Sequence, residues 1–304
     1  MKSVKSGLID GVIAFTMRGV YPLYWHLLQT VGATEILINR MLWSFVTLGL
    51  FNLMFGKLTD LKRILMEVRC DRKKLLLLLL ATFLLGLNWF IFAFAVVSGR
   101  LLEASLGYYI NPLLSIVLGV IFLKEKINRL QFIAFMLAAI AVFYLTLSYG
   151  TFPWLSVLLA MTFGCYGLVK KFMEMDATLS LFIETGTMLP ISLFVFTFWI
   201  VSGTSTFVSN DIGLILLLIG AGFITMSPMY FFTKAAKVLP LKTLGFLQYI
   251  EPTLQLLVAT FLIGEVLSTD KAITFILIWI ACLIFSVSHF FSTPKKISKF
   301  RKSI

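Results

Sequence analysis

Residues 103–119, EASLGYYINPLLSIVLG, and residues 243–259, TLGFLQYIEPTLQLLVA, decide the fold of this chain. A shift of 140 residues places Tyr109-Ile110-Asn111-Pro112 on Tyr249-Ile250-Glu251-Pro252. Small and polar residues also recur at spacings of three and four in both stretches, which marks one face of a helix. That face consists of Ser105, Tyr108, Asn111, Ser115 and Gly119 in the first stretch and of Gly245, Gln248, Glu251, Gln255 and Ala259 in the second. The two stretches predict an internal repeat.

The composition around this repeat is that of a membrane protein. The chain has 304 residues, of which 60% are hydrophobic and 13% are charged, whereas soluble domains are about 45–50% apolar and about 25% charged. A mean hydropathy of +0.98 leaves too little polar material to cover a soluble surface. The apolar content excludes disorder, and three cysteines exclude a disulfide scaffold.

Mostly apolar runs of about 20 residues, long enough to cross a membrane as a helix, occur ten times. They cover residues 7–28, 36–56, 75–97, 102–123, 130–148, 154–169, 179–201, 212–233, 241–263 and 272–291. We predict an all-α integral membrane protein with a first five-helix repeat in residues 1–150 and a second in 151–304. Because five is odd, the second repeat is inverted, an arrangement typical of alternating-access transporters.

The basic residues predict the orientation. Of the 26 Lys and Arg residues, 22 fall on one side of the predicted spans, and only Arg100 and Lys271 fall on the other. Arg18 and Arg40 lie inside spans. Since Lys and Arg collect on the cytoplasmic side, both termini are expected in the cytoplasm, including the basic tail. The net charge of +12 therefore reflects topology rather than nucleic-acid binding.

Two charges near the middle of their spans require an explanation. Arg18 in 7–28 and Glu251 in 241–263 have opposite signs and similar depth, and a charge at that depth costs roughly 2.5–3.5 kcal/mol. We expect them to pair. The pair fixes packing only, or it engages a charged substrate, or Glu251 takes up a proton; the sequence leaves these alternatives open.

The aligned prolines add to the predicted polar region. Each proline removes one helix hydrogen bond, and unpaired backbone groups in a membrane lie against protein or water. The predicted translocation path comprises Arg18, Asn88, Trp89, Tyr108, Asn111, Pro112, Ser227, Gln248, Glu251, Pro252 and Gln255. For Glu35 and Arg40 an interfacial role is expected, and the role of Glu184 is open.

Enzyme chemistry finds little support in the sequence. His26 and His289 lie at opposite ends of their spans and cannot share a metal. Neither a phosphate-binding loop nor a G-x-S-x-G nucleophile elbow is present in the sequence. We expect no enzymatic activity, no metal site and no cofactor.

Several segments resemble the RarD proteins of the EamA branch of the drug/metabolite transporter superfamily. They are residues 102–113 and 243–254, Glu35-Ile36-Leu37 with Arg40 and Trp43-Ser44-Phe45, Gly86 with Asn88-Trp89, 166–171, and Ile183-Glu184-Thr185. The resemblance implies a ten-helix permease for small organic molecules in a bacterial inner membrane. Arg18 stands where that pattern has an aromatic residue, and Glu251 where it has a small one.

The sequence therefore predicts a secondary transporter of small organic metabolites or drugs, embedded in the lipid bilayer and without a nucleic-acid partner. Coupling to a proton and exchange for another solute are alternatives. A passive channel and a non-transporting membrane sensor or scaffold are the rival functions. The substrate, the direction of transport and the oligomeric state are not specified by the sequence.

Overall fold

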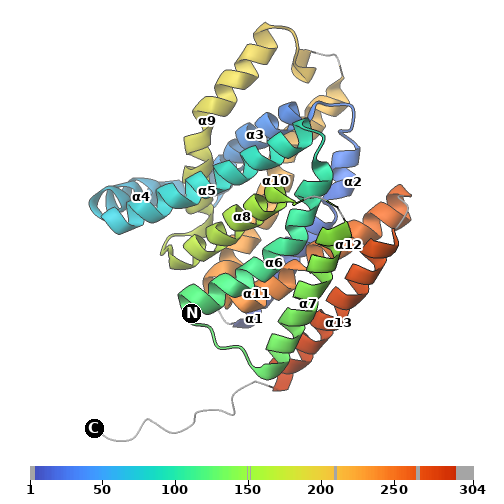
Figure 1. Ribbon diagram of the computed structural model, residues 1–304. Coiled ribbons are helices and arrows are strands. Elements are labelled where there is room, and N and C mark those ends of the chain that lie inside the picture. The colour runs from blue at the N-terminus through green and yellow to red at the C-terminus, as the bar shows by residue number, and fades with distance from the viewer. Residues whose placement is uncertain (1–3, 149, 151, 209–210, 265–267, 292–304) are drawn as a thin grey trace, which may run out of the picture. The chain divides into compact units, whose positions relative to one another are not determined.

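The computed structural model describes residues 4–148, 150, 152–208, 211–264 and 268–291. These residues form helices joined by short connections, with no strand among them. The α-helices, labelled in Figure 1, are α1 (Val4–Gly19), α2 (Tyr21–His26), α3 (Ala33–Met54), α4 (Leu58–Cys70), α5 (Arg72–Val97), α6 (Leu101–Leu123), α7 (Arg129–Ser148), α8 (Trp154–Phe172), α9 (Ala177–Val201), α10 (Ile212–Val238), α11 (Leu241–Gln248), α12 (Ile250–Val258) and α13 (Thr269–Phe291). Two short helical turns are η1 (Thr206–Val208) and η2 (Ala259–Ile263).

Eight of these helices are long and apolar enough to cross a membrane: α3, α5, α6, α7, α8, α9, α10 and α13. Each coincides with one of the ten predicted spans. The other two predicted spans, 7–28 and 241–263, are divided into shorter helices. The first consists of α1 and α2, and the second of α11, α12 and the π-helical turn η2.

The helices pack as two compact units. In the smaller unit α7 and α13 lie side by side (Figure 1). The Asn128 side-chain amide donates to Ser288 Oγ at 2.8 Å, and the Tyr144 hydroxyl donates to Asp270 Oδ1 at 2.7 Å. The larger unit contains the other helices. Each predicted repeat thus contributes its last span to the smaller unit, so the sequence repeats are not the units of packing.

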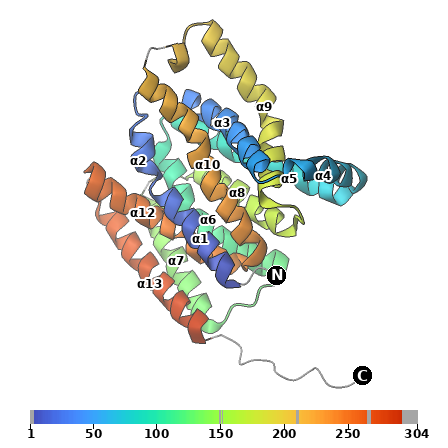
Figure 2. The same cartoon turned by 180° about the vertical axis from the view of Figure 1, so that it is seen from behind.

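In the larger unit α6 packs along α8, while α10 packs against both α1 and α3. Figure 2 shows α1 running beside α10. The core contains the rings of Phe15, Tyr166 and Phe232, which are completely buried. Many large apolar side chains face outward instead, among them Phe83 and Phe194. Such outward apolar surface suits contact with lipid and would be costly in water.

A glycine allows α6 and α11 to lie in close contact. A Cβ atom at Gly245 would stand 2.7 Å from the Pro112 carbonyl oxygen and 2.8 Å from the Ile116 side chain. Small residues permit such close backbone approach between membrane helices. The aligned stretches of the sequence repeat therefore meet directly in the larger unit.

Candidate functional site

The two divided spans break beside the predicted midplane charges. α1 ends at Gly19 and α2 begins at Tyr21, with Pro22 in its first turn. A proline there fits because its missing N–H has no partner in a first helical turn. In the second half of the chain, α11 ends at Gln248 and α12 begins at Ile250. By contrast, α6 continues through Pro112 as one helix, so the aligned prolines do not produce equivalent breaks.

Arg18 and Glu251 form the ion pair that the sequence predicts. Arg18 Nη2 lies 3.1 Å from Glu251 Oε1, and the two side chains are 13% and 6% exposed. Gln255 Nε2 donates to the Arg18 carbonyl oxygen at 3.4 Å and to Glu251 Oε1 at 3.5 Å. The guanidinium carbon also lies 4.7 Å from the centre of the Phe163 ring and 6.0 Å from that of Tyr108. The pair therefore joins α1 to α12 beside aromatic rings of α6 and α8.

One face of α6 continues this polar region towards α11. Tyr108, Asn111 and Ser115 follow at spacings of three and four, so they share that face. Gln248 Nε2 donates to Ser115 Oγ at 3.2 Å. Asn111 Oδ1, Gln248 Oε1 and Arg18 Nη1 are buried and have no hydrogen-bond partner among the residues that the structure describes. Buried polar atoms are normally paired, and the free atoms here offer two acceptors and one donor.

Other residues of the predicted path have local partners. Asn88 Nδ2 donates to the Leu159 carbonyl oxygen at 3.0 Å and to Thr162 Oγ1 at 2.8 Å, which ties α5 to α8. Ser227 Oγ donates at 2.7 Å to the Phe223 carbonyl oxygen within α10. Pro252 is buried in α12. The structure thus does not bring Asn88 and Ser227 into hydrogen-bonding contact with the Arg18–Glu251 pair.

Arg40, for which the sequence suggests an interfacial role, contacts side chains of three other helices of the larger unit. Its guanidinium carbon is 5.0 Å from the Trp25 ring centre and 5.8 Å from that of Trp89. Arg40 Nε donates to Thr225 Oγ1 at 3.0 Å. Trp89, from the predicted path, therefore contacts Arg40. The position of Arg40 within an apolar run was the available signal, but the aromatic surfaces that hold it come from α2 and α5.

A second ion pair, fully buried, joins α8 to α9. Lys170, one of the residues counted on the basic cytoplasmic side, has a fully buried side chain in α8 and pairs with Glu184 of α9. The Glu184 carboxylate also accepts hydrogen bonds from Ser180 Oγ at 2.6 Å and from the Tyr166 hydroxyl at 2.9 Å. Glu184, whose role was open, therefore connects α8 to α9.

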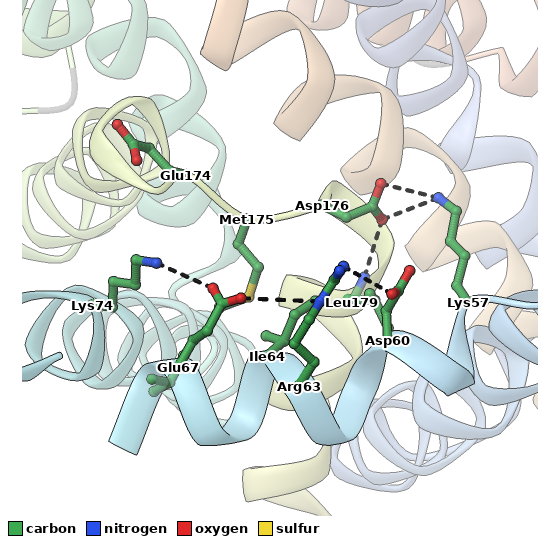
Figure 3. Close-up of a pocket in the computed structure, with 11 residues that line it drawn as sticks. Lys57, Asp60, Arg63, Ile64, Glu67, Lys74, Glu174, Met175, Asp176 and Leu179 are labelled. Atoms are coloured by element: carbon green, nitrogen blue, oxygen red, sulfur yellow. Dashed lines mark hydrogen bonds and ion pairs between the residues drawn. The ribbon is translucent and has the colours of Figure 1, made fainter. Parts of the chain in front are cut away.

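A pocket of about 260 Å³ lies between α4 and the segment that precedes α9 (Figure 3). Lys57 pairs with Asp176 at 3.0 Å, and Lys74 pairs with Glu67 at 3.2 Å. Partial burial raises the pKa of Asp176, but hydrogen bonds from Thr178 and Lys57 and the Lys57 charge outweigh it, so that pKa is lowered overall. These charges largely satisfy one another across the pocket.

Eight membrane-length helices, with charges buried among them, define a multi-pass membrane protein. The sequence pattern of the EamA-like transporter family matches residues 5–147. The chain belongs to this family and, within it, to the RarD group of the drug/metabolite transporter superfamily.

Its relatives align over nearly their whole lengths. An uncharacterized transporter of Bacillus subtilis, YojE, is 44% identical over 94% of this chain and 95% of its own. Protein RarD of Escherichia coli is 38% identical over 98% of this chain and 99% of its own. A crystal structure that is 14% identical superimposes with a TM-score of 0.72 over 93% of this chain and 98% of its own. That likeness concerns the fold. The family and the names of these relatives identify this chain as a membrane transporter.

Proposed function

We propose that this protein is a secondary transporter that moves small organic metabolites or drugs by alternating access. The observation that carries the proposal is the Arg18–Glu251 ion pair, which lies beside the breaks of two divided spans from opposite halves of the chain. Interrupted helices that meet near the middle of a membrane are typical of secondary-transporter substrate sites. Rocking one repeat against the other would make and break contacts at such a pair.

The proposal includes ten spans arranged as two inverted repeats. α1 with α2 forms the first span, and α11 with α12 and η2 forms the ninth. The uneven distribution of Lys and Arg supports cytoplasmic termini in a bacterial inner membrane. Reporters fused after Lys74 and after Lys302 are expected to read cytoplasmic, and one in the loop 202–210 external. Termini on opposite sides would contradict the inverted repeat.

A passive channel and a sensor or scaffold are the alternatives. A channel needs a continuous pore, whereas the charges of the Arg18–Glu251 and Lys170–Glu184 pairs are held in closed, largely buried contacts. A sensor needs an output surface, and the connections between the described spans are short apart from the segment that holds α4. Both observations favour a transporter.

Labelling of a single cysteine tests alternating access. With Cys70, Cys165 and Cys282 replaced by Ser, Asn111→Cys is exposed to a membrane-impermeant maleimide in spheroplasts and in inverted vesicles. The proposal expects labelling from both faces, and expects a stabilising solute to change the two rates in opposite directions. A screen of amino acids, nucleosides, vitamins and drugs by thermal stabilisation supplies that solute. Absence of labelling from either face would contradict the proposal.

A further inference from the structure

We infer that Arg40, together with Arg18, binds the carboxylate of the transported solute, so that the substrates are small organic anions. This inference rests on the proposed transport function and names the chemistry of its site. Its basis is Arg40 itself, a half-buried cation of the larger unit whose described neighbours are aromatic rings and a hydroxyl group, with no acid paired to it.

Arg40 is held firmly from three helices. It lies two turns into α3, with the Trp25 ring of α2 on one side and the Trp89 ring of α5 close by. The hydroxyl groups of Tyr21 and Tyr24 donate to carbonyl oxygens of α10, at Ile224 and Leu217, and thereby fix α2. Thr225 Oγ1 accepts a hydrogen bond from Arg40 Nε only. The two terminal nitrogens of Arg40 make no hydrogen bond to the described residues.

The charges around Arg40 leave an excess of one positive charge. Arg18 is compensated by Glu251. Glu35, also on α3, turns towards η1, where its carboxylate accepts from Ser205 Oγ at 2.8 Å and from the Thr206 N–H at 2.7 Å. Tyr21 and Tyr108, which with Arg18 act on the charge of Arg40, have hydroxyl groups that are uncharged at neutral pH.

Other buried charges of this unit have partners. Lys170 pairs with Glu184, and Lys234 Nζ lies 2.8 Å from Asp10 Oδ1. An uncompensated cation within a membrane is costly, so the single excess charge of Arg40 matches a ligand with one negative charge. A planar carboxylate also suits the planar donor fork of a guanidinium. A doubly charged phosphate would replace a positive excess by a negative one.

The free hydrogen-bonding atoms extend this assignment. Arg18 Nη1 offers a second donor for an anionic oxygen, while Asn111 Oδ1 and Gln248 Oε1 accept from a ligand. Tyr108 contacts Arg18, and Ser115 contacts Gln248. Since Asn111 lies between those two residues on one face of α6, the atoms extend over roughly 10 Å of helix. The favoured ligand is therefore a carboxylate that also carries hydroxyl or N–H donors.

Three probe sets on purified full-length protein test the charge requirement. Acetate, lactate and 4-hydroxybenzoate are each compared with the matching neutral amide, and choline serves as the cationic probe, all at equal ionic strength. At least one carboxylate is expected to raise the unfolding temperature with a saturating dose response, while its amide and choline do not. Stabilisation by none of the carboxylates, or equal stabilisation by the amides or by choline, would overturn the inference.

Substitution of Arg40 then tests the residue. Arg40→Met is expected to raise the dissociation constant of the stabilising carboxylate at least tenfold, and Arg40→Lys to raise it less. Arg63→Gln, at a side chain that is 67% exposed, is the control and retains binding. Unchanged carboxylate binding in Arg40→Met overturns the assignment of Arg40 to the carboxylate. If Arg40→Met does not fold, unchanged carboxylate binding in the double variant Arg40→Lys with Thr225→Val overturns it instead. Carboxylate binding without transport would contradict the proposed function alone, whereas transport of neutral solutes only would contradict this inference alone.

Discussion

Gly19 lies against Leu254 so closely that a Cβ atom at Gly19 would stand 2.5 Å from the Leu254 Cβ atom. This contact brings the end of α1 against α12, one residue after Arg18 and three after Glu251. The position of the ion pair therefore depends on the absence of a side chain at Gly19 as well as on the attraction between its charges.

Gly19→Ala is expected to destabilise the protein by about 1–3 kcal/mol, the usual cost of overpacking, because α1 and α12 must separate. Gly86→Ala is the control, since its Cβ would meet only the flexible end of Met188, at 3.2 Å. Thermal unfolding in detergent compares the two variants. Equal unfolding temperatures would show that the α1–α12 contact adapts without strain.

A double-mutant cycle measures the Arg18–Glu251 interaction. Loss of one partner of a buried pair costs on the order of 3–5 kcal/mol, although nearby water would reduce this. Arg18→Met combined with Glu251→Gln is expected to recover much of the stability lost in either single variant. Additive losses would mean that the two charges do not interact energetically.

The Lys170–Glu184 network is expected to be the more sensitive of the two pairs to loss of one partner, because both of its side chains are fully buried. Glu184→Gln leaves the Lys170 charge uncompensated and should lower the free energy of unfolding by about 3–5 kcal/mol. Tyr166→Phe removes one hydrogen bond to a charged group and should cost about 1.5–3 kcal/mol, while its ring remains stacked on Phe232. A smaller loss for Glu184→Gln than for Glu251→Gln would contradict the ranking of the two pairs.

Asp176 should make the stability depend on acid pH. Its pKa is lowered in the folded protein, so its charge adds stability above the unfolded-state pKa of about 3.9, and that stability is lost as pH falls through the folded-state pKa. Asp176 also caps α9 by accepting from the backbone N–H groups of Thr178 and Leu179. Asp176→Asn retains a capping side chain and removes the charge.

The expected difference in stability between wild type and Asp176→Asn is therefore present at neutral pH and disappears in acid. Unfolding temperatures of wild type and Asp176→Asn, measured from neutral to acid pH, test this pH dependence. Lys57→Met is a second way to remove the ion pair. A difference that is the same at every pH would assign the effect to helix capping instead.

The helical membrane class and the pairing of Arg18 with Glu251 could both be predicted from the sequence. Span length and apolar content determine the class, and two opposite charges at similar depth have few other partners. The breaks at Gly19 and Gln248 were not predictable to the residue. Pro112 and Pro252 occupy equivalent positions in the predicted repeat, yet α6 continues through Pro112 whereas the segment with Pro252 is divided into α11 and α12.

The contacts of Arg40 and Lys170 could not be predicted from the sequence. A long basic side chain near the end of a span either extends to the interface or turns inward. For Arg40, the choice depends on Trp25, Trp89 and Thr225, which come from three other helices. For Lys170 it depends on Glu184, across the turn between α8 and α9. The spacing of residues along a single helix does not predict either set of contacts.

Solute counterflow in proteoliposomes tests the central claim, secondary transport, most directly. Vesicles that contain the purified protein are loaded with an unlabelled stabilising solute and diluted into a trace of the same solute carrying a radiolabel. We predict transient accumulation of label above its equilibrium level in the wild type, and none with Arg18→Met combined with Glu251→Gln. Simple equilibration without an overshoot in the wild type, as through a passive channel, would contradict secondary transport.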